Sequence, residues 1–248
     1  MDIKYNALMI EIDNVTKIFK QKNKSIYACD SINMKIGERQ VFGIIGPNGA
    51  GKTTSLRLIS TLMNPSSGRI VINGFDTVKD KMRIREIIGF LTSEMRLPDN
   101  YTPRELMKFF GKLNNMRNSD LSDRIEFLTN LLSLEEYVDV LIGKLSTGNK
   151  QKTLIAISII HNPSIIIFDE PTSGLDLSAA QSVLRIINIM KDDGKTIILS
   201  THNMTIAERM CDRIAFINKG KIIKEGNTED IKELYGSKDL EEIYFNLI

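Results

Sequence analysis

The stretch Gly46-Pro47-Asn48-Gly49-Ala50-Gly51-Lys52-Thr53-Thr54 decides the fold of this 248-residue chain. It follows the apolar run Val41–Ile45 and precedes Ser55–Ile59, an order that predicts a strand, a glycine-rich turn and a helix. Glycines at 46, 49 and 51 let the backbone turn tightly and aim successive N–H groups inward, where a Cβ would obstruct them. The pattern indicates a loop that cradles phosphate.

The side chains that close this loop suit a nucleoside triphosphate. Lys52 can reach the terminal phosphates as a positive charge, and the Thr53 hydroxyl is placed to ligate Mg²⁺. The helix that follows adds the positive end of its dipole. We therefore expect residues 46–54 to bind ATP and Lys52 to act in catalysis as well.

Two adjacent acids follow a second strand that is predicted to be buried. The run Ser164–Asp169 is rich in bulky apolar residues and ends in a carboxylate, which is typical of a parallel strand tip. We expect Asp169 to hold Mg²⁺ and Glu170, the next residue, to orient or deprotonate the attacking water. Together with the glycine-rich loop, these acids predict Mg²⁺-dependent hydrolysis of a nucleoside triphosphate.

The rest of the chain alternates strands and helices, which predicts an α/β fold with a mainly parallel sheet. We expect a single P-loop NTPase domain. Residues 1–91 and 162–226 would form an N-terminal antiparallel β subdomain and a RecA-like parallel core. Residues 92–161 would form an inserted α-helical subdomain, and residues 227–248 a short helical tail.

Composition indicates the cellular compartment of the chain and excludes some kinds of partner. Charged residues make up 26% of the chain and the net charge is only +2, which argues against nucleic-acid binding. Cys29 and Cys211 stand alone, so buried free thiols in a reducing compartment are expected. Met1–Asn6 lacks a secretory pattern, and no apolar run approaches the roughly 20 residues that cross a bilayer. We expect a cytoplasmic chain that reaches a membrane only through a partner.

With three further motifs, the chain resembles the ATPase subunits of ABC transporters. Five motifs occur in the family's order: the P-loop at 46–53, Leu145-Ser146-Thr147-Gly148 at the signature position, Asp169-Glu170-Pro171-Thr172 as Walker B, Ser173-Gly174-Leu175-Asp176 as the D-loop, and His202 after Ser200-Thr201. They span most of the chain. Five ordered motifs are far more specific than a P-loop alone.

The resemblance implies a head-to-tail dimer, either of two copies or with a second ATPase subunit, that holds two ATP molecules at its interface. Ser146 and the Gly148 backbone would close over the γ-phosphate bound by the opposite subunit, and His202 would contact it as a catalytic switch residue. An aromatic residue would stack on adenine. Phe19 matches that position better than Tyr27, and packing within the hairpin is the alternative for both.

Two departures from the family pattern affect the site. Thr147 and Asn149 stand where glycine and glutamine are usual. The loop Thr92-Ser93-Glu94 lacks the glutamine that normally joins Mg²⁺ and water to the membrane partner. Ser93 falls on the glutamine position, and Glu94 is long enough to span the gap. We expect both near the metal, with Glu94 carrying the link.

The loop Gly89–Glu94, with Phe109-Phe110 downstream, looks like ATPase subunits of sodium-extruding Nat-type exporters and related ABC-2 exporters. This likeness implies a multi-spanning membrane permease as partner, which would hold the chain at the inner face of the cell membrane. The two phenylalanines would contribute to the docking face, or else form the core of the insertion. Two other interpretations stay open: a soluble ABC ATPase that is not coupled to transport, and an ATP-binding regulatory module with little turnover.

Overall fold

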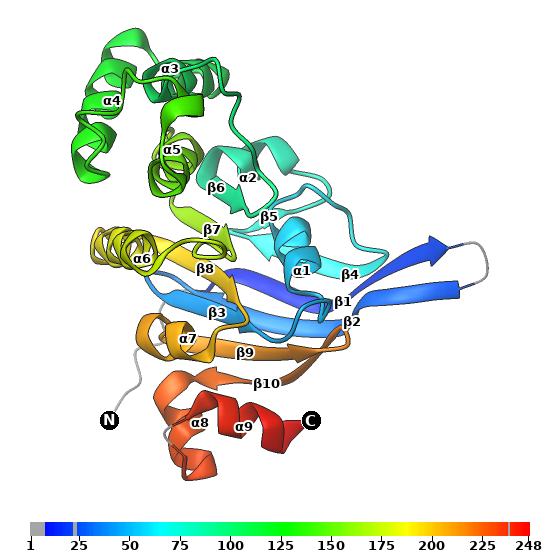
Figure 1. The fold of residues 1–248 in the computed structure, drawn as a ribbon. Helices are drawn as coiled ribbons and strands as arrows, with labels where there is room; N and C mark the ends of the chain where they lie inside the picture. Colours follow the sequence, from blue (N-terminus) through cyan, green and yellow to red (C-terminus); the bar gives the residue numbers. More distant parts are fainter. Residues whose placement is uncertain (1–7, 22–23, 238) are drawn as a thin grey trace.

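The computed structural model describes residues 8–21, 24–237 and 239–248, so Met1–Asn6 lies outside the described residues. Its strands form two sheets (Figure 1). The N-terminal sheet is antiparallel throughout, in the order β2-β1-β4-β5. Its strands are β1 (Leu8–Gln21), β2 (Lys24–Gly37), β4 (Ser67–Ile72) and β5 (Phe75–Asp76).

The second sheet has the order β10-β9-β3-β8-β7-β6, and all its neighbours are parallel except β9 and β10. Its strands are β3 (Val41–Ile45), β6 (Ile88–Thr92), β7 (Ile165–Asp169), β8 (Thr196–Thr201), β9 (Arg213–Asn218) and β10 (Lys221–Asn227). Register sets Thr92, Asp169 and Ser200 side by side at the carboxyl edge. Ligands of open parallel sheets bind at this edge.

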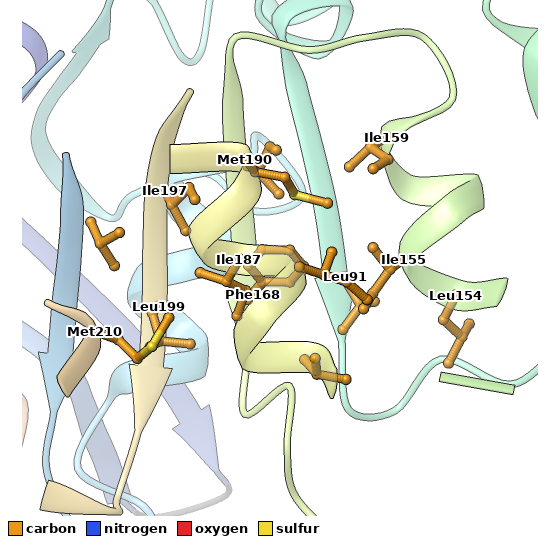
Figure 2. Packing of buried hydrophobic residues seen from close by; sticks show 14 of the residues in the cluster. Leu91, Leu154, Ile155, Ile159, Phe168, Ile187, Met190, Ile197, Leu199 and Met210 are labelled. Atoms are coloured by element: carbon orange, nitrogen blue, oxygen red, sulfur yellow. The ribbon is translucent and has the colours of Figure 1, made fainter. Parts of the chain in front are cut away.

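The parallel strands are buried on both faces, because alternate side chains enter two different hydrophobic cores. In β7, Ile166 and Phe168 face one core while Ile165 and Ile167 face the other. Figure 2 shows the first core, in which Phe168 lies among side chains of neighbouring strands and helices such as Ile187. The second core lies against the antiparallel sheet and the helix that follows the P-loop. The sheet is therefore a rigid base for the loops at its edge.

Helices cover the sheets and build the insertion. They are α1 (Lys52–Ile59), α2 (Lys81–Ile87), α3 (Pro103–Leu113), α4 (Asn118–Leu131), the 3₁₀ helix η1 (Ile142–Lys144), α5 (Thr147–Ile159), α6 (Leu177–Asp192), α7 (Met204–Met210), α8 (Thr228–Tyr235) and α9 (Leu240–Leu247). Figure 1 shows α3, α4 and α5 grouped at one end of the molecule, and α8 and α9 at the other. In the described ranges, no helix combines the length and apolar character needed to span a bilayer.

The observed architecture confirms the predicted α/β fold, with an antiparallel sheet beside a mainly parallel one. The helix α3 begins with a capping box, in which Thr102 accepts from the Glu105 amide and Glu105 accepts from the Thr102 amide. Both isolated cysteines, Cys29 and Cys211, are buried and free, as expected. Burial raises the pKa of the Cys29 thiol, so it remains protonated.

Candidate nucleotide-binding site

The loop after β3 is shaped by glycines that no other residue could replace. A Cβ built on Gly51 would lie 2.3 Å from the Ala28 carbonyl oxygen, and one on Gly46 would lie 2.2 Å from the Ile217 carbonyl oxygen. Gly51 also has a φ of 111°, a conformation that residues with a Cβ rarely adopt. The loop is therefore held tightly between the antiparallel sheet and β9.

Lys52 lies at the centre of the loop and is almost fully buried. Its Nζ donates to the carbonyl oxygens of Gly46 (2.8 Å) and Pro47 (3.2 Å). The same Nζ forms an ion pair with Glu170 Oε1 at 3.3 Å. These contacts hold the ammonium at the end of the loop nearest the two acids.

The adjacent acids Asp169 and Glu170 have different surroundings. Asp169 is buried, and its Oδ1 accepts from the Ser200 hydroxyl at 2.5 Å. Glu170 adopts a left-handed conformation with φ 51°, and its amide donates to the carbonyl and the hydroxyl oxygen of Ser200. This unusual turn directs the Glu170 side chain toward Lys52 and His202. His202 Nδ1 donates to Glu170 Oε1 at 3.0 Å. Glu170 Oε1 therefore contacts both Lys52 and His202, the other two predicted catalytic residues.

A cavity of about 570 Å³ opens beside these residues. It is lined by Ile26, Tyr27, Ala28, Asn48, Gly49, Gly51, Lys52, Thr53, Thr54, Ser93, Glu170, Ser173, His202 and Lys219. The predicted loop residues Gly46, Pro47 and Ala50 are not in the lining. The first two position Lys52, and the carbonyl of the buried Ala50 accepts from the Gly220 amide.

At the antiparallel-sheet end of the cavity, the structure favours Tyr27 over Phe19 as the aromatic next to a base. Tyr27 and Ile26 line the cavity, whereas Phe19 does not. Phe19 is the cross-strand neighbour of Ile26, and Lys17 Nζ lies 5.5 Å from the centre of its ring. The family pattern predicts Phe19 as the residue that stacks on adenine. The twist and bulges of the β1–β2 hairpin decide which side chain reaches the cavity, and they place Tyr27 there.

The loop after β6 also differs from the expectation. Ser93 lines the cavity, but Glu94 does not. The Glu94 carboxylate instead bonds Arg57 Nη2 on α1 at 2.5 Å. The proposed role of Glu94 as a metal neighbour does not match this arrangement. The physical reason is that α1 presents the Arg57 guanidinium close to the loop, and the Glu94 carboxylate forms a charge-assisted hydrogen bond with it.

The signature residues lie apart from the cavity of their own chain. Ser146 caps α5 by accepting from the Asn149 amide at 3.3 Å, and it is exposed. Gly148 is half-buried, and a Cβ there would lie 3.0 Å from the Cβ of Ala179. The first turn of α5 thus directs its positive dipole end to the outside.

Sequence reasoning missed three contacts of this site. Ser200 binds both the Asp169 carboxylate and the Glu170 amide. Gln151 Nε2 donates to the Pro171 carbonyl at 2.9 Å and ties α5 to the loop after Walker B. Lys219 lines the cavity from the turn after β9. The position of Ser200, two residues before His202 at a strand end, was the only available signal for any of them.

The residues also fit a divalent cation. Asp169 is a buried carboxylate that accepts a hydrogen bond from the Ser200 hydroxyl and forms no ion pair with the described residues, so its negative charge suits a cation. Thr53 offers a hydroxyl oxygen in the adjacent cavity. Hard oxygen ligands of this kind suit Mg²⁺, which would complete its shell with phosphate oxygens and water. When bound, Mg²⁺ neutralises charge on the transferred phosphoryl group.

Comparison with known proteins agrees with this geometry. Residues 29–173 match the family described as ABC transporter. The ABC transporter ATP-binding protein NatA of Bacillus subtilis is 37% identical over 96% of this chain and 97% of its own. The methionine import ATP-binding protein MetN of Histophilus somni is 32% identical over 90% of this chain and 66% of its own.

Solved structures show the same fold. A dimeric post-hydrolysis form of the ATP-binding cassette MJ0796, bound to ADP and Pi, superposes with a TM-score of 0.80 at 28% identity. The match covers 89% of this chain and 99% of that one.

Fold and site together define a P-loop ATPase of the ATP-binding cassette class. The family match and the curated relatives place the chain in the ABC transporter family. It is accordingly a transporter subunit that binds ATP with Mg²⁺ and hydrolyses the nucleotide in a cycle coupled to transport.

Proposed function

We propose that this chain powers an exporter by closing head-to-tail on a second ATPase subunit, beneath a multi-spanning permease at the inner face of the cell membrane. The observation that carries the proposal is the junction at Glu170 Oε1, which Lys52 and His202 both contact. Lys52 would bind the terminal phosphates, Glu170 would orient and deprotonate the attacking water, and His202 would hold Glu170 in place and contact the γ-phosphate.

Two features support closure on a second subunit. The first turn of α5, with Ser146 exposed and Gly148 beside it, is not used by the cavity of its own chain. A helix N-terminus of this kind binds phosphate. The structural relative MJ0796 is itself described as a dimer. The same surface serves pairing with an identical copy or with a different ATPase subunit.

Two comparisons bear on the direction of transport. The match to NatA extends over nearly the whole of both chains, whereas about a third of the matched MetN lies outside the match. The loop Gly89–Glu94 resembles that of exporter ATPases, as noted from the sequence. We infer export on this basis. In inside-out vesicles that carry the permease co-purifying with this chain, ATP should drive Na⁺ inward, and ATP-driven loss of preloaded Na⁺ would contradict export.

Coupling to the permease would pass through the loop after β6. Ser93 faces the nucleotide cavity, and the adjacent Glu94 is tied to Arg57, five residues after Lys52 on α1. The loop therefore contacts both the nucleotide cavity and the P-loop helix. Phe109 on α3 is exposed and stands edge-on to Phe110, with ring centroids 5.4 Å apart. Phe110 packs against the core, so Phe109 is the ring available to a partner.

An exchange of charges tests this link. In proteoliposomes with the permease, Glu94→Ala and Arg57→Ala should each lower the ratio of permease-stimulated to basal ATPase several-fold, because either change releases the loop. The double exchange Arg57→Glu with Glu94→Arg should restore the ratio. Arg69→Ala, which breaks an exposed pair of 3.0 Å with Asp76 on the N-terminal sheet, is the matched control. A ratio unaffected by Glu94→Ala refutes the coupling role.

One observation favours a second candidate, a regulatory module that binds ATP with little turnover. Thr147 carries an exposed side chain at the first residue of α5, where glycine is usual in the family that the sequence resembles, and this side chain would narrow the approach of a second nucleotide to the α5 N-terminus. Steady-state hydrolysis by the wild type separates the two candidates. Turnover that Glu170→Gln abolishes supports the motor, and wild-type turnover no higher than that of Glu170→Gln supports the regulatory module.

A further inference from the structure

The turn between β9 and β10 breaks a local rule of hairpins. It has two residues, Lys219 and Gly220, and both have positive φ, at 46° and 79°. Asn-Gly is the sequence that such a turn favours, because a long side chain in the left-handed region is strained. A lysine in this conformation costs stability, so its side chain is a candidate for a function beyond the turn.

The same turn is fixed against both walls of the nucleotide cavity. The Gly220 amide donates to the Ala50 carbonyl of the P-loop, and its carbonyl accepts from the Asp30 amide of β2, each at 2.8 Å. A Cβ on Gly220 would lie 2.9 Å from the Tyr27 carbonyl oxygen, so the backbones are in close contact. The base of the Lys219 side chain is therefore held at the end of the cavity where Tyr27 lies.

Charge balance distinguishes Lys219 from the other lysines nearby. Lys52 is paired with Glu170 inside the cavity, and Lys221, two residues further on, is paired with Asp30 at 3.2 Å. Lys219 lines the cavity, is exposed, and has no acidic partner among the residues that the structure describes. Its ammonium therefore adds positive charge to the cavity wall that no acidic side chain of the described residues balances.

We propose that Lys219 is a nucleotide-positioning residue that binds the phosphate nearest the ribose. Lys52 serves the end of the cavity next to Glu170, where the terminal phosphate would lie, whereas Lys219 lines the cavity from the turn whose Gly220 contacts the Tyr27 backbone. A contact to the first phosphate is common to ADP and ATP, so Lys219 should strengthen binding of both equally. This inference rests on nucleotide binding in the cavity and not on export, dimerisation or coupling.

Calorimetric titration with ADP and with a non-hydrolysable ATP analogue tests the proposal. Lys219→Asn is the key variant, because asparagine suits the turn while removing the charge. It should weaken both nucleotides by about three- to tenfold, with a melting temperature equal to or above that of the wild type. Raising the ionic strength should shrink the difference. Lys219→Arg should keep wild-type affinity, and Lys221→Asn is the matched control outside the cavity.

Three results would overturn the proposal: wild-type affinity in Lys219→Asn, an equal loss in Lys221→Asn, or a loss for the ATP analogue alone. The last would mean that Lys219 serves the terminal phosphate. The nucleotide site itself is checked separately with Lys52→Ala. If this variant loses binding and Lys219→Asn does not, the cavity binds nucleotide and only the role of Lys219 is wrong.

Discussion

Replacing Glu170 by glutamine should strengthen nucleotide binding while it abolishes hydrolysis. In the structure the Lys52 ammonium, which we propose binds phosphate, is held by the Glu170 carboxylate at 3.3 Å. The same carboxylate would repel a γ-phosphate. Glutamine keeps the shape and can still accept from His202, but it removes the negative charge. Both effects of the change therefore favour the bound nucleotide.

The size of the gain follows from the burial of the pair. At 3.3 Å, an effective dielectric constant of about 20 gives an attraction of roughly 5 kcal/mol. The side chains are only 5% and 15% exposed, so desolvation offsets most of this attraction. The two carbonyls that bind Lys52 also remain after the substitution. We expect a net gain of about 1–2 kcal/mol, or roughly five- to thirtyfold in affinity.

Calorimetry of the wild type and Glu170→Gln, with ADP and with a non-hydrolysable ATP analogue, measures this gain. The analogue should benefit more than ADP, because it carries the γ-phosphate that faces the carboxylate. Turnover should fall by about 10²–10⁴-fold in the same variant. An affinity equal to or below that of the wild type would refute the idea that Glu170 restrains Lys52.

Three further changes test other parts of the structure. Lys52→Ala should weaken ATP at least about 100-fold by calorimetry, and near-wild-type affinity would contradict the P-loop assignment. Gly51→Ala should lower the free energy of unfolding by about 2–4 kcal/mol, because the new Cβ meets the Ala28 carbonyl oxygen, and an unchanged urea midpoint would speak against that contact. Burial lowers the pKa of His161, whose Nε2–H donates to the Ile88 carbonyl, so the unfolded chain binds the proton more readily. Stability should therefore fall as pH drops below 6.5, and His161→Gln should reduce this slope in urea titrations at several pH values.

Most of the fold could be predicted from the sequence, because its signals are local. Apolar runs ending in Asp169 or preceding Gly46 are typical of buried parallel strands, and Thr102 with Glu105 marks a helix start. The first hairpin was less predictable. The polar residues Lys20–Ser25 are typical of a turn, but β1 continues to Gln21 and β2 begins at Lys24. Cross-strand pairing extends these polar strands beyond what their composition favours.

The part of the site that comes from one continuous motif was predictable, because the P-loop contributes both its backbone and the Lys52 and Thr53 side chains. The site was not predictable where side chains from distant segments meet. The capture of Glu94 by Arg57 joins residues 37 positions apart, and Lys219 reaches the cavity only because β9 lies next to β3. Whether Tyr27 or Phe19 faces the cavity depends on bulges in the β1–β2 pairing, which leave no trace in composition.

The central claim, closure of two ATPase subunits over ATP, is tested most directly by the mass of the Glu170→Gln variant in solution. Light scattering after size exclusion should give a monomer without nucleotide and a dimer of about twice the mass with Mg-ATP. Adding Ser146→Arg should abolish the dimer, because a long side chain would then occupy the helix end that we propose binds the opposite subunit's phosphate. A variant that stays monomeric with ATP, or a dimer that survives Ser146→Arg, would contradict the account.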